Sequence, residues 1–398
     1  MQKTSSSYTF QLSTGGLIYW LLIRIHAQAP DHYHTKRRIL LFCTLTWVPL
    51  ILLSAFEGNL INHEISISFI SDLKPYVRYL VALPLLIVAD ILIDPLIAAI
   101  ISNIGSSGII TGDNKSAFER AFKTLDRRND SFVADIVIIG IAILSSSAFL
   151  ANLNSLDVYS EQSTWIAILE GNQYHLTYAG WWFVFVSSLL LQIFLYRWLW
   201  RFFIWCEFLY RVSRINLALE PTHPDLAGGL GVLKNSQSAF IVLFLAFGCM
   251  LSVSLAQEIL YSDATMAIAR PVAAAFVASC LVINTLPLLF FSKQLILAKR
   301  RGRIIYGALG YKLSRAFDEK WGQAEDAKIG KNLLEVADAS AVCDYSTVFE
   351  IVKNMRFIPV SGREYVIQAI ILIAPFAPLV FLEMSFTEVL KRLFDTVI

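Results

Sequence analysis

The residues best suited to chemistry in this chain are two carboxylates that interrupt an apolar run. Asp90 and Asp94 lie in the stretch "LLIVADILIDPLIAAI", and Pro95 follows directly. Their spacing places both side chains on one helix face. An acidic residue at the centre of a membrane helix costs about 2.5–3.5 kcal/mol, so it usually faces a cavity, a partner or a pathway. These hard oxygen ligands are suited to H⁺, Na⁺ or another small cation.

A second polar pair is predicted near the middle of another membrane helix. Asn284 and Thr285 precede Pro287 in the stretch "NTLP". Broken helices with polar groups near the bilayer midplane recur in transporter and channel sites. We therefore expect Asn284 and Thr285 to face the carboxylates of the second span as further ligands. The alternative is structural, because proline is generally commoner in membrane helices than in soluble ones.

Three further charged residues could neutralise these carboxylates instead. Arg197 and Arg201 lie one turn apart near the inner end of the fourth span, and Asp135 begins the third span. Such residues could form a purely structural charge network with Asp94. Asp90 is expected to lie too deep for an interfacial arginine, which favours a pathway.

The cytoplasmic loop 219–231, "LEPTHPDLAGGLG", concentrates His223, Asp225, Gly228 and Gly229. It could be a structural turn, a gate or proton-transfer site, or a backbone nest for phosphate. Its glycine spacing matches neither the dinucleotide fingerprint nor the P-loop. We expect no metal or cofactor, since no metalloprotease, hydrolase or di-iron motif is present.

The composition indicates an integral membrane protein. Of the 398 residues, 56% are hydrophobic and only 16% are charged, against about a quarter in soluble domains. Apolar runs long enough to cross the hydrocarbon layer recur along the chain. They predict an all-α bundle of seven transmembrane helices, at 39–57, 76–102, 133–152, 178–204, 238–260, 271–297 and 364–384.

The distribution of basic residues predicts the orientation of the bundle. Alternate segments, beginning with the N-terminal one, hold 28 of the 33 Lys and Arg residues. Because positive charge stays on the cytoplasmic side, the N-terminus is expected there and the C-terminus outside. The predicted parts are a cytoplasmic N-terminal segment with an interfacial helix (1–38), a membrane domain with spans 1–6 (39–298), a helical cytoplasmic insert (299–363), span 7 (364–384) and an extracytoplasmic tail (385–398).

Two predicted helices have a capping-box sequence at their cytoplasmic N-termini. Residues 115–128 form an amphipathic pattern, and Ser116 with Glu119 reads as a capping box. Ser361 with Glu364 has the same spacing at the start of the seventh span. Both serines are therefore expected to be N-caps.

The pattern as a whole favours a small-ion channel or ion-coupled transporter over an enzyme. The alternative is a membrane-embedded enzyme or sensor that works through His223, Asp225 and the 299–363 insert. A scaffold for another membrane protein is a third interpretation. The expected partners are the lipid bilayer and a small inorganic ion, with no nucleic acid, and a homo-oligomer is compatible with this architecture. Short loops and the absence of targeting signals favour a bacterial inner (plasma) membrane.

Overall fold

A computed structural model describes residues 10–24, 35–152, 163–171, 173–261, 265–322 and 338–383. Within these residues, seven helical runs are long and apolar enough to cross a membrane. This confirms the predicted all-α seven-helix membrane bundle. The runs are Thr35–Phe56, Leu73–Ser106, Phe132–Ala151, Tyr178–Ser213, Gly231–Tyr261, Met266–Leu289 and Gly362–Leu382.

Among the first four spans, the first and third are single helices, and the second and fourth combine several helical elements. Two of them contain a π-helical turn, Arg78–Ala82 in the second span and Phe183–Ser188 in the fourth. A 3₁₀ turn, Gly112–Asn114, precedes the amphipathic helix α5. The helices are α1 (Gly16–Arg24), α2 (Thr35–Phe56), α3 (Leu73–Val77), α4 (Leu83–Ser106), α5 (Lys115–Asn129), α6 (Phe132–Ala151), α7 (Tyr178–Trp182) and α8 (Leu189–Ser213).

The last three spans and the predicted cytoplasmic insert follow. A 3₁₀ turn, Gly231–Leu233, opens the fifth span, and another, Ala374–Leu379, interrupts the seventh. A π-turn, Asp318–Gly322, follows the long helix α11. The helices are α9 (Lys234–Tyr261), α10 (Met266–Leu289), α11 (Ser292–Phe317), α13 (Asp338–Asn354), α14 (Gly362–Ile373) and α15 (Val380–Glu383).

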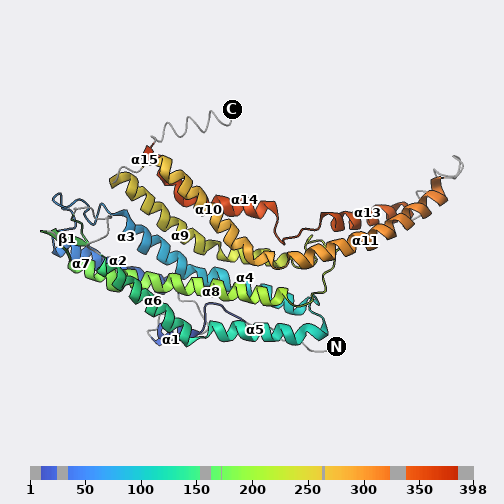
Figure 1. The fold of residues 1–398 in the computed structure, drawn as a ribbon, viewed down its shortest axis with the longest axis horizontal. Helices are drawn as coiled ribbons and strands as arrows, with labels where there is room; N and C mark the ends of the chain where they lie inside the picture. The colour runs from blue at the N-terminus through green and yellow to red at the C-terminus, as the bar shows by residue number, and fades with distance from the viewer. Residues whose placement is uncertain are drawn as a thin grey trace.

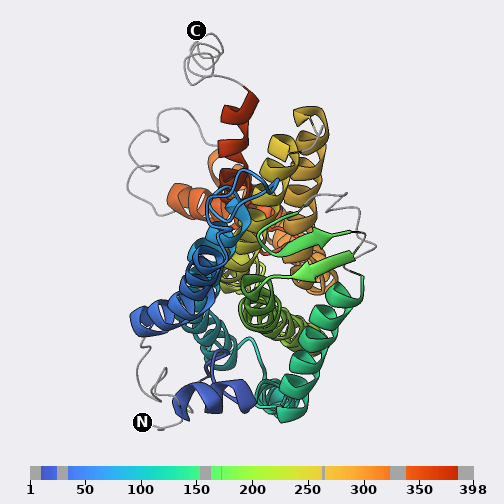
Figure 2. The same ribbon diagram turned by 90° about the vertical axis from the view of Figure 1, so that its left-hand side faces the viewer.

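A small antiparallel hairpin, β1 (Ala167–Glu170) and β2 (Gln173–Leu176), lies across the outer end of the bundle (Figures 1 and 2). The buried Trp165 before it donates its indole N–H to Asp72 at 2.9 Å. Gln257, at the outer end of α9, donates to the same carboxylate at 2.8 Å. The Asp72 carboxylate therefore ties the hairpin to the start of the second span and to α9.

The core of the bundle is formed by α4, which packs along α9. Ile93 and Ile97 on the inward side of α4 are fully buried, whereas Leu92 on the other side is 47% exposed. This one-sided burial is expected for a helix whose outer face meets lipid. At the predicted cytoplasmic end, α5 packs on α8, and Phe118 meets Phe208 edge to face with ring centroids 6.1 Å apart. The predicted amphipathic helix is therefore present.

The short helix α1 packs against α6 at the edge of the bundle (Figure 2). Residues Phe10 and Leu12, just before it, are buried in the main core. Residues 10–24 are thus an integral part of the helical bundle. This position brings the backbone of residues 13–18 beside the charged residues of α4, α6 and α8.

The sixth span ends earlier than predicted. Helix α10 ends at Leu289, two residues after Pro287, and α11 begins at Ser292. The prediction extended this span to residue 297 because the apolar run continues. Figure 1 shows α11 and its partner α13 projecting from the bundle on the side of α5.

One of the two predicted capping boxes is confirmed. The N–H of Ser361 donates to the Glu364 side chain at 3.1 Å, in a capping box that begins α14. The Ser116–Glu119 box is wrong, because the 3₁₀ turn places the helix start at Lys115 and its N-cap at Asn114. Ser116 is therefore inside α5 and does not cap it.

Candidate functional site

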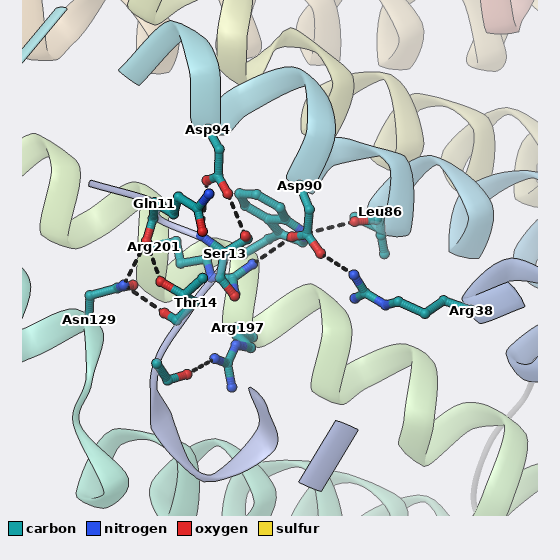
Figure 3. Close-up of polar contacts among 12 residues, drawn as sticks. Gln11, Ser13, Thr14, Arg38, Leu86, Asp90, Asp94, Asn129, Arg197 and Arg201 are labelled. Carbon is teal, nitrogen blue, oxygen red and sulfur yellow. Dashed lines mark hydrogen bonds and ion pairs between the residues drawn. The ribbon is translucent and has the colours of Figure 1, made fainter. Parts of the chain in front are cut away.

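Asp90 lies between two arginines. Arg38 of α2 reaches its carboxylate with an Nη1–Oδ2 distance of 2.6 Å, and Arg201 of α8 with an Nη1–Oδ1 distance of 3.1 Å (Figure 3). All three residues are at most 5% exposed. The expectation that Asp90 lies beyond the reach of arginine is therefore wrong. Each oxygen of the carboxylate has a guanidinium partner, which makes charge-assisted hydrogen bonds stronger than neutral ones.

Arg201 also connects α4 to the N-terminal segment. Its Nη2 donates to the Ser13 carbonyl at 2.6 Å, and its guanidinium lies 4.6 Å from the centre of the Trp198 ring. Trp198 in turn donates its indole N–H to the carbonyl of Leu86 in α4 at 2.8 Å. A stacked arginine with several hydrogen bonds has its position tightly fixed.

Asp94, one turn further along α4, binds the same segment. The backbone N–H of Ser13 donates to its carboxylate at 3.0 Å, and the Ser13 hydroxyl makes a second hydrogen bond to it (Figure 3). Asp94 is 2% exposed. Asp90 and Asp94 thus share a helix face, as predicted, but bind different partners.

The second charge pair joins α6 to α8. Arg197 donates to both carboxylate oxygens of Asp135, at 3.0 and 3.1 Å, and to the carbonyl of Gly15. Asp135 also accepts the N–H of Ile18 at 3.0 Å, and Asp130 accepts that of Gly16 at 2.8 Å. Helix α1 therefore begins with carboxylates at its N-terminal amides, where negative charge is favourable.

These contacts require glycine at residue 16. Gly16 has φ +78°, and a Cβ atom there would collide with the carboxylate of Asp135. The left-handed backbone conformation is accessible to glycine without steric cost. The sequence "TGG" that precedes α1 therefore fits the turn by which the chain passes the Arg197–Asp135 pair.

We call Arg38, Asp90, Asp94, Asp135, Arg197 and Arg201 the charged cluster. A cavity of about 10 Å³ lies within it, lined by Asp90 and the three arginines and covered by residues of the N-terminal segment. That volume is about the size needed for one water molecule. The Nε atoms of Arg38 and Arg201 are buried and have no hydrogen-bond partner among the described residues. The cavity is thus lined by a carboxylate and guanidinium groups among mostly apolar side chains.

The charged cluster lies nearer the predicted cytoplasmic side than the position of Asp90 in its span suggested. Arg38 is in the first turn of α2 and Asp135 in the first turn of α6. The second span is 34 residues long, about 50 Å, and exceeds the roughly 30 Å hydrocarbon layer. Arg38 reaches Asp90 from the first turn of α2, so the middle of the second span lies near the predicted cytoplasmic end of that helix.

Asn284 and Thr285 lie in a different cluster. With Gln237 of α9 and Gln368 of α14 they form a buried group that we call the amide cluster. Gln237 Nε2 donates to Thr285 at 2.9 Å, and Gln368 Nε2 donates to Gln237 Oε1 at 3.0 Å. Asn284 donates to the Gln237 carbonyl at 3.0 Å and to Gln368 at 3.2 Å. The structure therefore does not bring Asn284 or Thr285 to the carboxylates of α4.

The loop 219–231 is organised by Asp225. Its carboxylate accepts the N–H groups of Ala227, Gly229 and Gly231, at distances from 2.7 to 3.2 Å. Burial raises the pKa of Asp225, but these hydrogen bonds and the one from His223 outweigh it and lower the pKa overall. The backbone nest considered for phosphate is thus filled by a carboxylate of the loop itself.

The glycines of this loop are also used in packing. Gly228 and Gly229 have φ values of +65° and +96°. The N–H of Arg356 donates to the Leu226 carbonyl at 2.7 Å, and a Cβ at Gly302 of α11 would collide with Pro221. His223 lies 2.9 Å from Asp225, and its side chain is 48% exposed. The loop therefore joins α8, α9, α11 and the segment before α14.

Several residues of both clusters were missed in the sequence. Arg38 belongs to the basic stretch "TKRR" and reads as solvated, and Ser13 precedes a short apolar stretch. Arg38 directly precedes the apolar run, which was a signal that it belongs to the span. Gln237 and Gln368 are neutral residues in apolar helices, and only their shared helix-to-helix contacts reveal them.

No protein-family model, curated protein or solved structure matches this chain. Its function is therefore inferred from the geometry of its polar residues.

Proposed function

We propose that the protein moves a small ion across the membrane, that the ion is a proton, and that Asp90 takes it up. The observation that carries this proposal is the position of Asp90, between Arg38 and Arg201 and beside a cavity of one-water size. Ionisable groups buried within membrane helices mark proton relays and ion paths. The plasma membrane of a bacterium, with its proton gradient, is the proposed location.

The arrangement favours a proton over a metal cation. A Na⁺-like ion needs several free oxygen ligands, whereas both oxygens of Asp90 have a guanidinium partner. A proton requires only one carboxylate oxygen and a water molecule that delivers it.

Proton uptake at Asp90 would change the contacts of Arg201. A hydronium in the cavity would transfer its proton to the carboxylate and leave as water, which removes one negative charge from the cluster. Arg201, which also binds the Ser13 carbonyl, would then lose its ionic partner. Proton release to the other side would restore the pair. Residues 13–18 are accordingly the segment whose position would respond to the protonation of Asp90.

The competing enzyme or sensor function rests on the loop 219–231. Asp225 is the natural base of such a site, but its oxygens already accept three backbone N–H groups. His223 lies on the surface beside it. These contacts support a structural role for the loop, so we do not propose catalysis there.

Proton flux into proteoliposomes tests the proposal. A pH-sensitive dye inside the vesicles reports the rate of proton entry. For wild type, this rate is expected to be clearly above that of empty vesicles. For Asp90→Asn, it is expected to fall to the rate of empty vesicles. The matched control is Asp135→Asn, which removes an equally buried, arginine-paired carboxylate that does not line the cavity. It should retain flux.

Correct folding is checked by size-exclusion chromatography and thermal unfolding. If Asp90→Asn is poorly folded, the flux is measured with the double variant Arg38→Gln/Asp90→Asn instead, because that variant has one unpaired buried charge fewer. Background flux in a well-folded wild type, or undiminished flux in a folded Asp90 variant, would overturn the proposal.

A further inference from the structure

A groove runs along the membrane face of the bundle between α6 and α8. Its volume is about 590 Å³, and its walls are mostly apolar, with Val137 and Ile141 on one side and Trp200 and Phe203 on the other. Arg128 and Ser131 lie at one end of it. Ser131 is the N-cap of α6 and Arg128 belongs to the last turn of α5. That end is therefore at the predicted cytoplasmic surface of the membrane.

The length of the groove matches one leaflet of a bilayer. From Ser131 to Ile141, α6 rises about 15 Å, which is half of the roughly 30 Å hydrocarbon thickness. A groove of this length can hold an acyl chain along its whole extent within the cytoplasmic leaflet. The other leaflet would be out of reach.

Two arginines share one carboxylate near the predicted cytoplasmic end of the groove. Glu207 pairs with Arg128 at 2.6 Å and with Arg211 at 2.8 Å, so two cations share one carboxylate. The side chains of Arg128 and Arg211 are 41% and 44% exposed, which leaves donors available to a ligand. Trp200 donates its indole N–H to the Arg128 carbonyl at 3.4 Å. Tryptophan at this depth is typical of the lipid headgroup region.

We infer that this groove is a binding site for an anionic phospholipid of the cytoplasmic leaflet. The phosphate contacts Arg128, and one acyl chain lies against Val137, Ile141 and Phe203. Guanidinium groups bind phosphate through charge-assisted, often bidentate hydrogen bonds. The apolar walls of the groove suit the acyl chain of the lipid, and the arginines near its end suit the negatively charged headgroup.

The test is lipid retention measured by native mass spectrometry, with phosphatidylglycerol and phosphatidylcholine of the same acyl chains as probes. Wild type is expected to retain phosphatidylglycerol preferentially. Arg128→Gln should weaken that retention about fivefold, the effect of one basic charge at a membrane surface, and leave phosphatidylcholine unchanged. Arg120→Gln, on the exposed side of α5, is the matched charge control and should have little effect.

Blocking the groove provides the second arm of the experiment. Val137→Trp should reduce retention of both lipids, whereas Leu144→Trp, exposed on the same helix outside the groove, should not. Glu207→Gln removes the shared carboxylate and should strengthen phosphatidylglycerol binding. This gain keeps the proposal testable if an arginine variant is unstable. Equal losses in Arg128→Gln and Arg120→Gln, or an unaffected Val137→Trp, would overturn it.

Discussion

The charged cluster and the amide cluster are both buried between membrane helices, but they differ in charge, packing and partners. The charged cluster joins α2, α4, α6 and α8 to the backbone of residues 13–18 and encloses a small cavity beside Asp90. The amide cluster joins α9, α10 and α14 through neutral side chains that bond mainly to one another. Buried polar side chains are therefore arranged in two ways in this bundle, and the charged cluster is the one that lies beside the cavity at Asp90.

The two clusters also differ in how much a single substitution is expected to lower the free energy of unfolding. Hydrogen bonds between membrane helices contribute about 0.6 kcal/mol each on average, because the separated helices also find partners. Removing one member of a buried ion pair costs about 3–5 kcal/mol, since the other charge is left without compensation. We therefore expect the two clusters to respond very differently to single substitutions.

The largest effect is expected for Asp90→Asn. This change leaves Arg38 and Arg201 buried without their carboxylate, so the free energy of unfolding should fall by about 3–5 kcal/mol. Denaturant titration of the purified protein in detergent micelles measures it. Adding Arg38→Gln should recover part of the loss, because one of the two unpaired charges is removed. A double variant less stable than Asp90→Asn would show that Arg38 stabilises the fold by other contacts.

The second prediction tests whether the N-terminal segment belongs to the charged cluster. Gly16→Ala should destabilise the protein by about 3 kcal/mol, because it combines a left-handed alanine with a collision at Asp135. Gly58→Ala is the matched control: Gly58 has φ +73° with no neighbouring atom within 4 Å. Gly58→Ala should lose only the about 1–2 kcal/mol that a left-handed backbone conformation costs alanine. Equal losses in the two variants, measured by the same titration, would mean that residues 13–18 are not held by Asp135.

Much of the fold could be predicted from the sequence because hydrophobic length is a long-range signal. Each of the seven spans was found, and the clearest error was the end of the sixth. There the apolar run continues through Phe290 and Phe291, while the helix ends after Pro287. The Ser116 cap was also misplaced, because a 3₁₀ turn before it starts the helix earlier. Local turn geometry is not encoded in hydropathy.

The candidate site was only partly predictable. Asp90 and Asp94 were found because charge within an apolar run is conspicuous, and Arg197, Arg201 and Asp135 were found for the same reason. Which of them pair depends on how helices α2, α4, α6 and α8 are arranged, and no spacing within one helix fixes that. The role of residues 13–18 could not be predicted, because they bind through main-chain N–H and C=O groups, which are present at almost every residue of any sequence.

The third prediction concerns the amide cluster. Gln237→Leu removes the donor to Thr285 and the acceptor for Gln368, so we expect a loss of about 2 kcal/mol from two hydrogen bonds and one unsatisfied amide. Proton flux should be unchanged in proteoliposomes, because the cluster is separate from Asp90. A loss of flux in a folded Gln237→Leu would instead join the two clusters in one pathway, as the sequence suggested.

The smallest effect is expected in the loop that connects the helices of the two clusters. Asp225→Asn keeps the shape of the side chain but removes the charge that accepts three N–H groups, so the loss should be about 1 kcal/mol at neutral pH. His223→Ala should change stability by less than about 0.5 kcal/mol, since its side chain is half exposed.

The effect of Asp225 should also depend on pH in a defined direction. Its pKa is lower in the folded protein than the roughly 3.9 of an unfolded chain, so the carboxylate stabilises the fold above that value. The stabilisation is lost as the pH falls through the folded pKa, where both states are protonated. The difference between wild type and Asp225→Asn should therefore be constant from pH 8 to about pH 5 and shrink below about pH 4. A difference that instead changes near neutral pH would show that a group other than the Asp225 carboxylate controls the stability of the loop, and would return the loop to the candidates for a proton-linked gate.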